Sequence, residues 1–189
     1  ETPPDGIPCV SAMHAAGAKA ATEHLLELGH RRIGAIGGQP GWYANDERMM
    51  GFRAALATAG LLPDPDLILY SDWRSASGEA AAEELLSRPE PPTAIFAFND
   101  NVAIGAVNAA RRLGLRVPDD LSVVGFDDTF QATIVSPALT TVRQPLAELG
   151  RMGVSLLMRL LERQRLDALR IELATTLVVR DSTGPAPTG

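Results

Sequence analysis

Short apolar runs alternate along most of the chain with segments in which apolar residues recur at helical spacing. The short runs predict strands at residues 7–10, 32–37, 67–70, 93–98 and 122–126. The spaced segments predict helices at residues 18–28, 46–59, 77–86 and 99–113. Strands that alternate with helices of this length form right-handed βαβ units, so we expect the α/β class with a doubly wound parallel sheet.

The pattern changes after Pro137. An extended run at residues 139–143 precedes Pro145, which suits the first turn of a long helix with an apolar face. A β-branched segment at residues 171–179 predicts a last strand. The sheet of residues 31–138 needs neither the long helix nor the strand and helix that precede residue 31. We therefore expect one near-complete subdomain, part of a second, and a disordered tail at residues 184–189.

Charge and composition narrow the possible partners. The 189 residues carry a formal net charge of −6 and have a pI near 5.1, which argues against a DNA-binding surface within this chain. The single cysteine, Cys9, cannot form an internal disulfide, which is compatible with the cytoplasm. No apolar run reaches the ~20 residues of a membrane span, and the first six residues do not resemble a signal peptide.

The strongest candidate for chemistry is the run at residues 122–126, which ends in Gly-Phe-Asp-Asp. A buried strand there delivers Asp127 and Asp128 to its carboxyl end, the edge at which open α/β sheets bind ligands. The residues alone leave three readings of the Asp-Asp pair open, namely a turn, a metal site or a ligand acceptor. We expect Asp127 to accept hydrogen bonds from a ligand and Asp128 to cap the next turn.

Further candidates follow other predicted strands. Arg48, just past a Gly-rich turn, could offer paired donors to a ligand, or could pair on the surface with a neighbouring carboxylate. Asn99 could donate to and accept from a hydroxyl, while Asp100 is expected to cap the following helix. Trp73 could stack on a sugar or a base, or lie half-buried in the core, and Trp42 is a weaker candidate. The three histidines share no metal-ligand spacing and are expected to be structural.

Several segments together resemble the effector-binding core of the lactose/galactose repressor (LacI/GalR) family of bacterial transcription regulators, in the family's order and spacing from about residue 10 to residue 183. They are Thr22-Glu-His-Leu-Leu-Glu-Leu-Gly-His-Arg-Arg-Ile, Glu47-Arg-Met-Met-Gly-Phe, Phe98-Asn-Asp-Asn-Val-Ala-Ile-Gly-Ala, Val117-Pro-Asp-Asp-Leu-Ser-Val-Val-Gly-Phe-Asp-Asp, Pro137-Ala-Leu-Thr-Thr-Val-Arg-Gln-Pro and Leu177-Val-Val-Arg-Asp-Ser-Thr.

The resemblance implies a type I periplasmic-binding-protein-like core, in which two similar α/β subdomains close on a small metabolite. Residues 1–30 and 139–165 would form part of the first subdomain, and residues 31–138 and 166–183 the second. The chain would cross between the subdomains near residues 29–31, near residues 140–144 and before residue 171. The chain would then be the C-terminal part of such a core, with the DNA-binding headpiece absent.

The resemblance also implies a function without catalysis and without a cofactor. The effector would be a small metabolite of the sugar class, held by Arg48, Asn99 and Asp127 with Trp73 and Trp42 nearby. A homodimer would bind operator DNA only through the absent headpiece. Met13 stands where the family commonly has an aspartate, and Leu146 stands at a wall position that is often aromatic. These departures favour a less polar ligand, or one held mainly by the second subdomain.

Two other functions remain open at this point. A periplasmic sugar-binding protein shares the fold, although the segment from residue 121 to residue 143 favours the regulator. A metal-dependent enzyme or phosphate receiver could use Asp100, Asp127 and Asp128. Phosphoryl chemistry of that kind needs a nearby lysine, and the only lysine, Lys19, lies in a helix assigned to the other subdomain.

Overall fold

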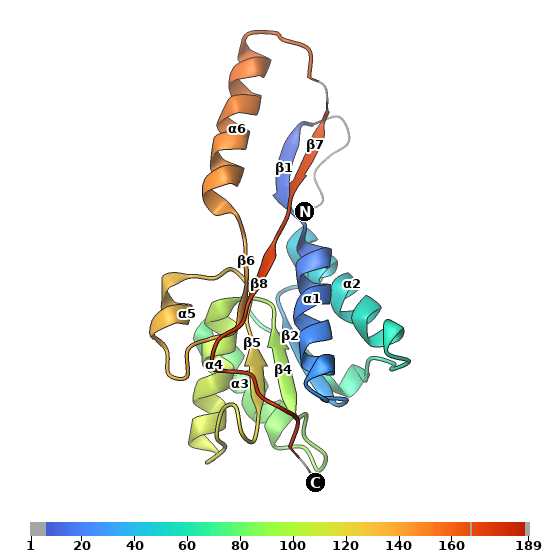
Figure 1. Ribbon diagram of the computed structural model, residues 1–189, viewed down its shortest axis with the longest axis vertical. Coiled ribbons are helices and arrows are strands. Elements are labelled where there is room, and N and C mark those ends of the chain that lie inside the picture. Colours follow the sequence, from blue (N-terminus) through green and yellow to red (C-terminus); the bar gives the residue numbers. More distant parts are fainter. Residues whose placement is uncertain (1–6, 167, 188–189) are drawn as a thin grey trace.

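The computed structural model describes residues 7–166 and 168–187. The chain folds into a larger α/β unit, called the body here, and a narrow arm that projects from one end of it (Figure 1). The body contains α1 (His14–Glu27), β2 (Ile33–Gly37), α2 (Tyr43–Thr58), β3 (Ile68–Tyr70), α3 (Ser75–Leu86), β4 (Ala94–Ala97), α4 (Asp100–Arg112), β5 (Ser122–Val124) and α5 (Phe130–Ile134). The arm contains β1 (Cys9–Ala12), α6 (Leu146–Leu161) and β7 (Arg170–Leu173), and the paired strands β6 (Thr141–Arg143) and β8 (Thr176–Val178) lie where it joins the body.

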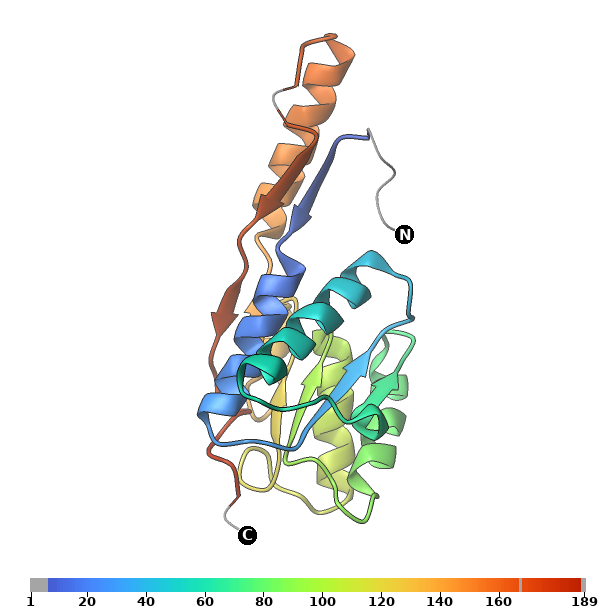
Figure 2. The same cartoon turned by 90° about the vertical axis from the view of Figure 1, so that its right-hand side faces the viewer.

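The body is a parallel sheet in the order β3-β2-β4-β5 with helices on both faces. Helices α1 and α2 pack together on one face, and α3 and α4 pack on the other (Figure 2). Strand β4 shows why both faces must be covered, because its side chains alternate between two cores. Ile95 and Ala97 face α3 and α4, while Phe96 faces α1 and α2, and all three are fully buried. The doubly wound α/β class expected from the sequence is confirmed.

The arm is a small layer of its own. Strand β1 pairs in parallel with β7, and α6 packs against β1. In the described structure Leu156 is the one buried residue of α6, so most of the apolar face of that helix is exposed. The chain passes between arm and body at Met13, at residues 144–145 and at residues 174–175.

Helix α1 lies in the body, which differs from the assignment of residues 1–30 to the first subdomain. Ala18, Ala21 and Leu25 are fully buried in the core that contains Phe96. Glycine permits this packing, because a side chain at Gly51 of α2 would meet the carbonyl oxygen of Ala15 at 2.1 Å. The first crossing is therefore at Met13 and not at residues 29–31.

The chain end also differs from the expectation. The segment 171–179, expected as one strand, forms two, because β7 pairs with β1 in the arm while β8 pairs with β6 below it. The expected disorder of residues 184–189 is wrong for the first of them. Gly184 donates its N–H to Ser122 Oγ at 3.0 Å, and Ala186 donates its N–H to the carbonyl oxygen of Leu28 at 2.8 Å. Residues 188–189 lie outside the described structure.

Candidate functional site

The carboxyl ends of the body strands meet below the arm, and Arg48 lies at the centre of this edge. Helix α2 begins at Tyr43, earlier than the expected start near residue 46, and Asn45 in its first turn accepts the N–H of Gly38. Arg48 therefore lies in the second turn, where its side chain is only 5% exposed. One of its terminal nitrogens, Nη1, donates to the carbonyl oxygen of Phe98, which follows β4.

Aromatic rings flank this guanidinium. Its Cζ atom lies 3.8 Å from the centroid of the Phe126 ring and 5.9 Å from that of Trp73. A cation over a ring face is attracted by the electron density of the ring, and more strongly when water is excluded. Burial lowers the pKa of Arg48 to about 10, although the carboxylates of Asp127 and Asp100 oppose the shift. The side chain therefore stays charged at neutral pH.

Asp127 faces Arg48 from the end of β5. Arg48 Nη2 lies 3.4 Å from Asp127 Oδ1, and Gln144 Nε2 donates to the same oxygen at 2.6 Å. Burial raises the pKa of Asp127 to about 6, even though Arg48 favours the charged form. The backbone of Asp127 has a φ of 123°, a conformation that L-residues rarely adopt. Strained backbone of this kind clusters at functional sites.

His14 also belongs to this cluster, which differs from the purely structural role expected for the histidines. Its Nδ1 lies 3.4 Å from Arg48 Nη2, and its ring contacts those of Tyr43 and Phe126. Arginine is only a donor, so Nδ1 must accept and the proton must sit on Nε2. Burial, with the positive charge of Arg48, lowers the pKa of His14 to about 4. The imidazole is therefore neutral at physiological pH.

Trp73 and Asn99 form a connected pair. The indole of Trp73 lies against Gly38, where any side chain would collide with it, and the φ of Trp73 is 70°. The indole N–H is buried without a hydrogen-bond partner among the described residues. Asn99 donates from Nδ2 to the carbonyl oxygen of Trp73 at 3.0 Å and accepts the N–H of Val102 at 2.8 Å. Asn99 therefore holds Trp73 in place. Trp42, by contrast, is 53% exposed ahead of α2.

Two aspartates have roles other than those expected. Asn99, not Asp100, caps α4, and the fully buried Asp100 instead accepts from Thr141 Oγ1 at 2.5 Å and from the N–H of Thr129 at 2.7 Å. Burial raises the pKa of Asp100, although these hydrogen bonds oppose the shift. Asp128 does not cap a turn but forms ion pairs with Arg143 and Arg180.

Metal-dependent chemistry would need a cluster of side chains that could bind a metal ion. Within residues 7–166 and 168–187, no three histidine, cysteine, aspartate or glutamate side chains come together so that they could hold a metal ion. No helix in these ranges has the length and apolar character needed to span a bilayer.

Known proteins match this chain in sequence and in fold. Residues 22–183 match the family model described as a periplasmic binding protein-like domain. The regulator DegA of Bacillus subtilis is 43% identical over 172 residues, which are 91% of this chain and 51% of DegA. The regulator CelR of Thermobifida fusca is 38% identical over 180 residues, 95% of this chain and 53% of CelR. The chain thus spans about half the length of the curated relatives it matches.

Solved structures agree with these matches. A structure titled as a complex of the regulator CelR with cellobiose has a TM-score of 0.91 at 38% identity and covers 95% of this chain and 55% of its own. A LacI-family regulator from Mycobacterium smegmatis has a TM-score of 0.90 at 38% identity, covering 98% and 68%. The chain therefore belongs to the periplasmic-binding-protein-like family and matches part of the core of LacI-family regulators. These relatives are transcription regulators and not periplasmic transport proteins.

Proposed function

We propose that this chain binds a small uncharged effector, of the sugar class, at the edge of the body that faces the arm, and that the effector controls a transcription regulator. The contact between Arg48 and Asp127 carries this proposal. It places a charged donor and a charged acceptor side by side, with the rings of Trp73 and Phe126 next to them. Hydroxyl groups need donors and acceptors together, and the C–H faces of a sugar pack on aromatic rings.

The charge balance of the site favours an uncharged ligand. Asp127 offsets the charge of Arg48, whose terminal nitrogens already contact Phe98, Asp127 and His14. Because His14 is neutral, the cluster has no further cation for a phosphate or carboxylate. The solved relative with cellobiose in its title holds an uncharged sugar.

We extend the proposal to the regulator as a whole. The relatives are about twice as long as this chain, and the net charge of −6 does not suit DNA binding by this part. DNA contact would be made by a segment outside this chain. An effector that contacts both body and arm would favour one orientation of the arm and shift the regulator between states. The role is one of binding, not catalysis.

Thermal unfolding of the 189-residue chain with a panel of ligands tests the site. Cellobiose, glucose, ribose, glucose 6-phosphate and glucuronate cover uncharged and anionic sugars. An uncharged sugar at ~100 times its dissociation constant should stabilise the fold by ~2.7 kcal/mol. Asp127→Asn should abolish the shift, because the amide offers one acceptor oxygen in place of two and carries no charge. The shift should also weaken as the pH falls from 7.5 to 5, since the pKa of Asp127 is about 6.

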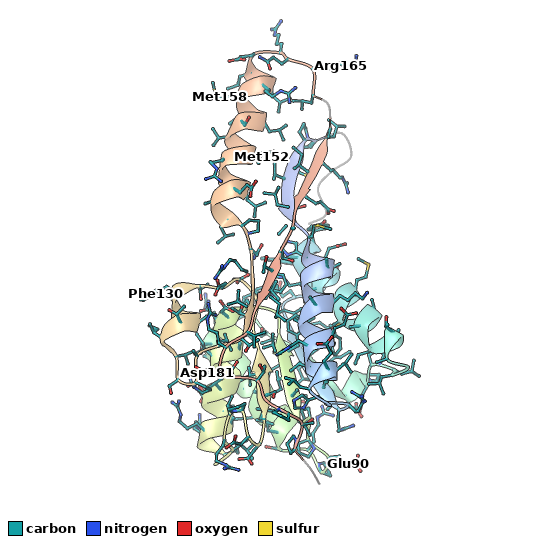
Figure 3. All side chains as sticks on the ribbon, viewed as in Figure 1. Glu90, Phe130, Met152, Met158, Arg165 and Asp181 are labelled. Atoms are coloured by element: carbon teal, nitrogen blue, oxygen red, sulfur yellow. The ribbon has the colours of Figure 1, made fainter. Side chains whose placement is uncertain are left out.

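Asp181→Asn is the matched control, because Asp181 is an exposed carboxylate on the body, away from the arm (Figure 3). It should keep the full ligand-induced shift. Stabilisation by glucose 6-phosphate or glucuronate but by no uncharged sugar would contradict the proposed class. Equal shifts in Asp127→Asn and in the unchanged protein would show that the sugar binds elsewhere.

We also propose that the chain forms a homodimer through α5. Phe130 is 72% exposed and Ile134 is 64% exposed on this short helix, and the side chain of Phe130 stands at its outer edge (Figure 3). Two-fold pairing of such a patch would bury both residues in each copy. In sedimentation velocity we expect a dimer that Ile134→Asp converts to a monomer, while Val154→Asp on α6 does not. A monomer at every concentration of the unchanged chain would contradict this proposal.

A further inference from the structure

Asp128 joins two segments that link the body to the arm. Its Oδ2 accepts from Arg143 Nε at 2.5 Å, and Arg143 ends β6, just before the chain enters the arm. Its Oδ1 accepts from Arg180 Nη2, and Arg180 lies just after β8, where the chain has returned from the arm. One carboxylate therefore holds the outgoing and the returning segment at the same point.

Two of the three side chains in this ion cluster are shielded from water. The side chain of Asp128 is 7% exposed and that of Arg180 is 16% exposed, whereas that of Arg143 is 58% exposed. Burial acts to raise the pKa of Asp128, but the hydrogen bonds from Arg180 and Arg143 outweigh it and leave the pKa below its ordinary value. Asp128 is therefore ionised at neutral pH, and a shielded pair of this kind is weakened little by salt.

Arg180 is also fixed to the body by other groups. Its Nη1 donates to the carbonyl oxygen of Leu139 at 2.7 Å, and its backbone N–H donates to Thr140 Oγ1 at 2.9 Å. The planar guanidinium thus bridges a carboxylate and a carbonyl, a geometry that lysine or glutamine could not reproduce. The two segments are also joined by the pairing of β6 with β8, which extends over three residue pairs.

The first crossing, at Met13, is connected to the same corner through Asp127, the residue before Asp128. Asp127 accepts from Gln144, which lies on the second crossing, and contacts Arg48, which in turn contacts His14 beside the first crossing. The backbone N–H of Asp127 donates to the carbonyl oxygen of Val142 on β6 at 2.8 Å. The Asp127-Asp128 corner is thus in contact, directly or through one residue, with all three segments that support the arm.

From this arrangement we infer that Asp128, Arg143 and Arg180 are positioning residues that act as a latch and set the orientation of the arm relative to the body. The latch is independent of any ligand. That it also links the arm to an effector held at Asp127 rests on the proposed function. Without the carboxylate charge, the two arginines lose their shared partner, and the arm should sample a wider range of orientations.

Distance measurements between two spin labels test the latch in the ligand-free chain. With Cys9→Ser as background, labels at Met158→Cys on α6 and Glu90→Cys at the far end of the body span the joint (Figure 3). We expect one narrow distance distribution in the starting protein. Asp128→Asn and Arg180→Gln should each at least double its width, and the double variant should broaden it by less than the two single effects added together, because both variants remove the ion pair between Asp128 and Arg180.

Arg116→Gln is the matched control, since it removes an arginine that pairs with Asp120 at 2.9 Å on the surface of the body. It should leave the distribution unchanged. If Asp128→Asn does not fold, Arg143→Gln replaces it, because Arg143 is the exposed member of the cluster and its substitution disturbs the fold less. The distance distribution should broaden in this variant too. An unchanged distribution in the folded Asp128 or Arg143 variant would overturn the latch, whatever the outcome of the ligand panel.

Discussion

Replacing Leu25 by alanine is expected to lower the free energy of unfolding by about 2–5 kcal/mol, the range found when a buried large aliphatic side chain is replaced by alanine. Leu25 is fully buried on α1 and belongs to the core formed with Phe52 and Phe96. The substitution removes apolar contacts and leaves a cavity that α1 and α2 can fill only by moving closer. Glycine contacts between these helices already bring them close together, so little collapse is available.

Urea unfolding followed by circular dichroism measures this effect. Leu62→Ala is the matched control, because Leu62 is 91% exposed on the same unit of the structure. It should change the free energy of unfolding by less than about 0.5 kcal/mol. Similar small effects in both variants would contradict the packing of α1 in the body, since a helix loosely attached to the arm would tolerate the cavity.

Replacing Gly105 by alanine is expected to destabilise the fold by about 1–3 kcal/mol, the usual effect of overpacking a close contact. A Cβ at Gly105 of α4 would lie 2.2 Å from the carbonyl oxygen of Ser75 and 2.6 Å from the backbone nitrogen of Glu79, both on α3. Backbone atoms cannot rotate away as a side chain can. The added methyl group must therefore separate α3 from α4, and the core between them loses contacts.

The same substitution at Gly150 should have the opposite sign. Gly150 is exposed on α6, and a Cβ there would meet no atom within 4 Å. Alanine in an open helical position stabilises by about 0.5–1 kcal/mol, because it restricts the unfolded chain and favours the helix. Thermal or urea unfolding of the two variants side by side gives the comparison. A stabilising Gly105→Ala would show that α3 and α4 are further apart than described here.

The local pattern of apolar and polar residues predicted the alternation of strands and helices, and it predicted the sheet edge at which we propose the effector binds. Strand β4 was predictable because its four residues, Ala94–Ala97, are all apolar, and a parallel strand that is covered on both faces requires such a run. Asp127 was predicted in the same way, because it follows the apolar run that contains β5. Residues that follow parallel strands lie at the carboxyl edge of the sheet. Arg48 and Asp127, 79 positions apart, meet at that edge.

Tertiary packing decided what lies within reach of those residues. His14 and Gln144 carry no local signal, since each is a single polar residue beside a crossing, and only the meeting of three crossings brings them to Arg48 and Asp127. Asn99 and Asp100 are equally good helix caps by residue type, and the buried hydroxyl of Thr141 selects Asp100 for a different contact.

The sequence by itself therefore determined the class of fold and placed two charged residues at the edge proposed to bind the effector, because strand burial and strand ends leave a short-range pattern. Only the tertiary structure decided that α1 lies in the body, that residues 171–179 form two strands, and that Asp128 holds two arginines. These features depend on partners far away along the chain, and an amphipathic helix or a β-branched strand presents the same pattern whichever partner it packs against.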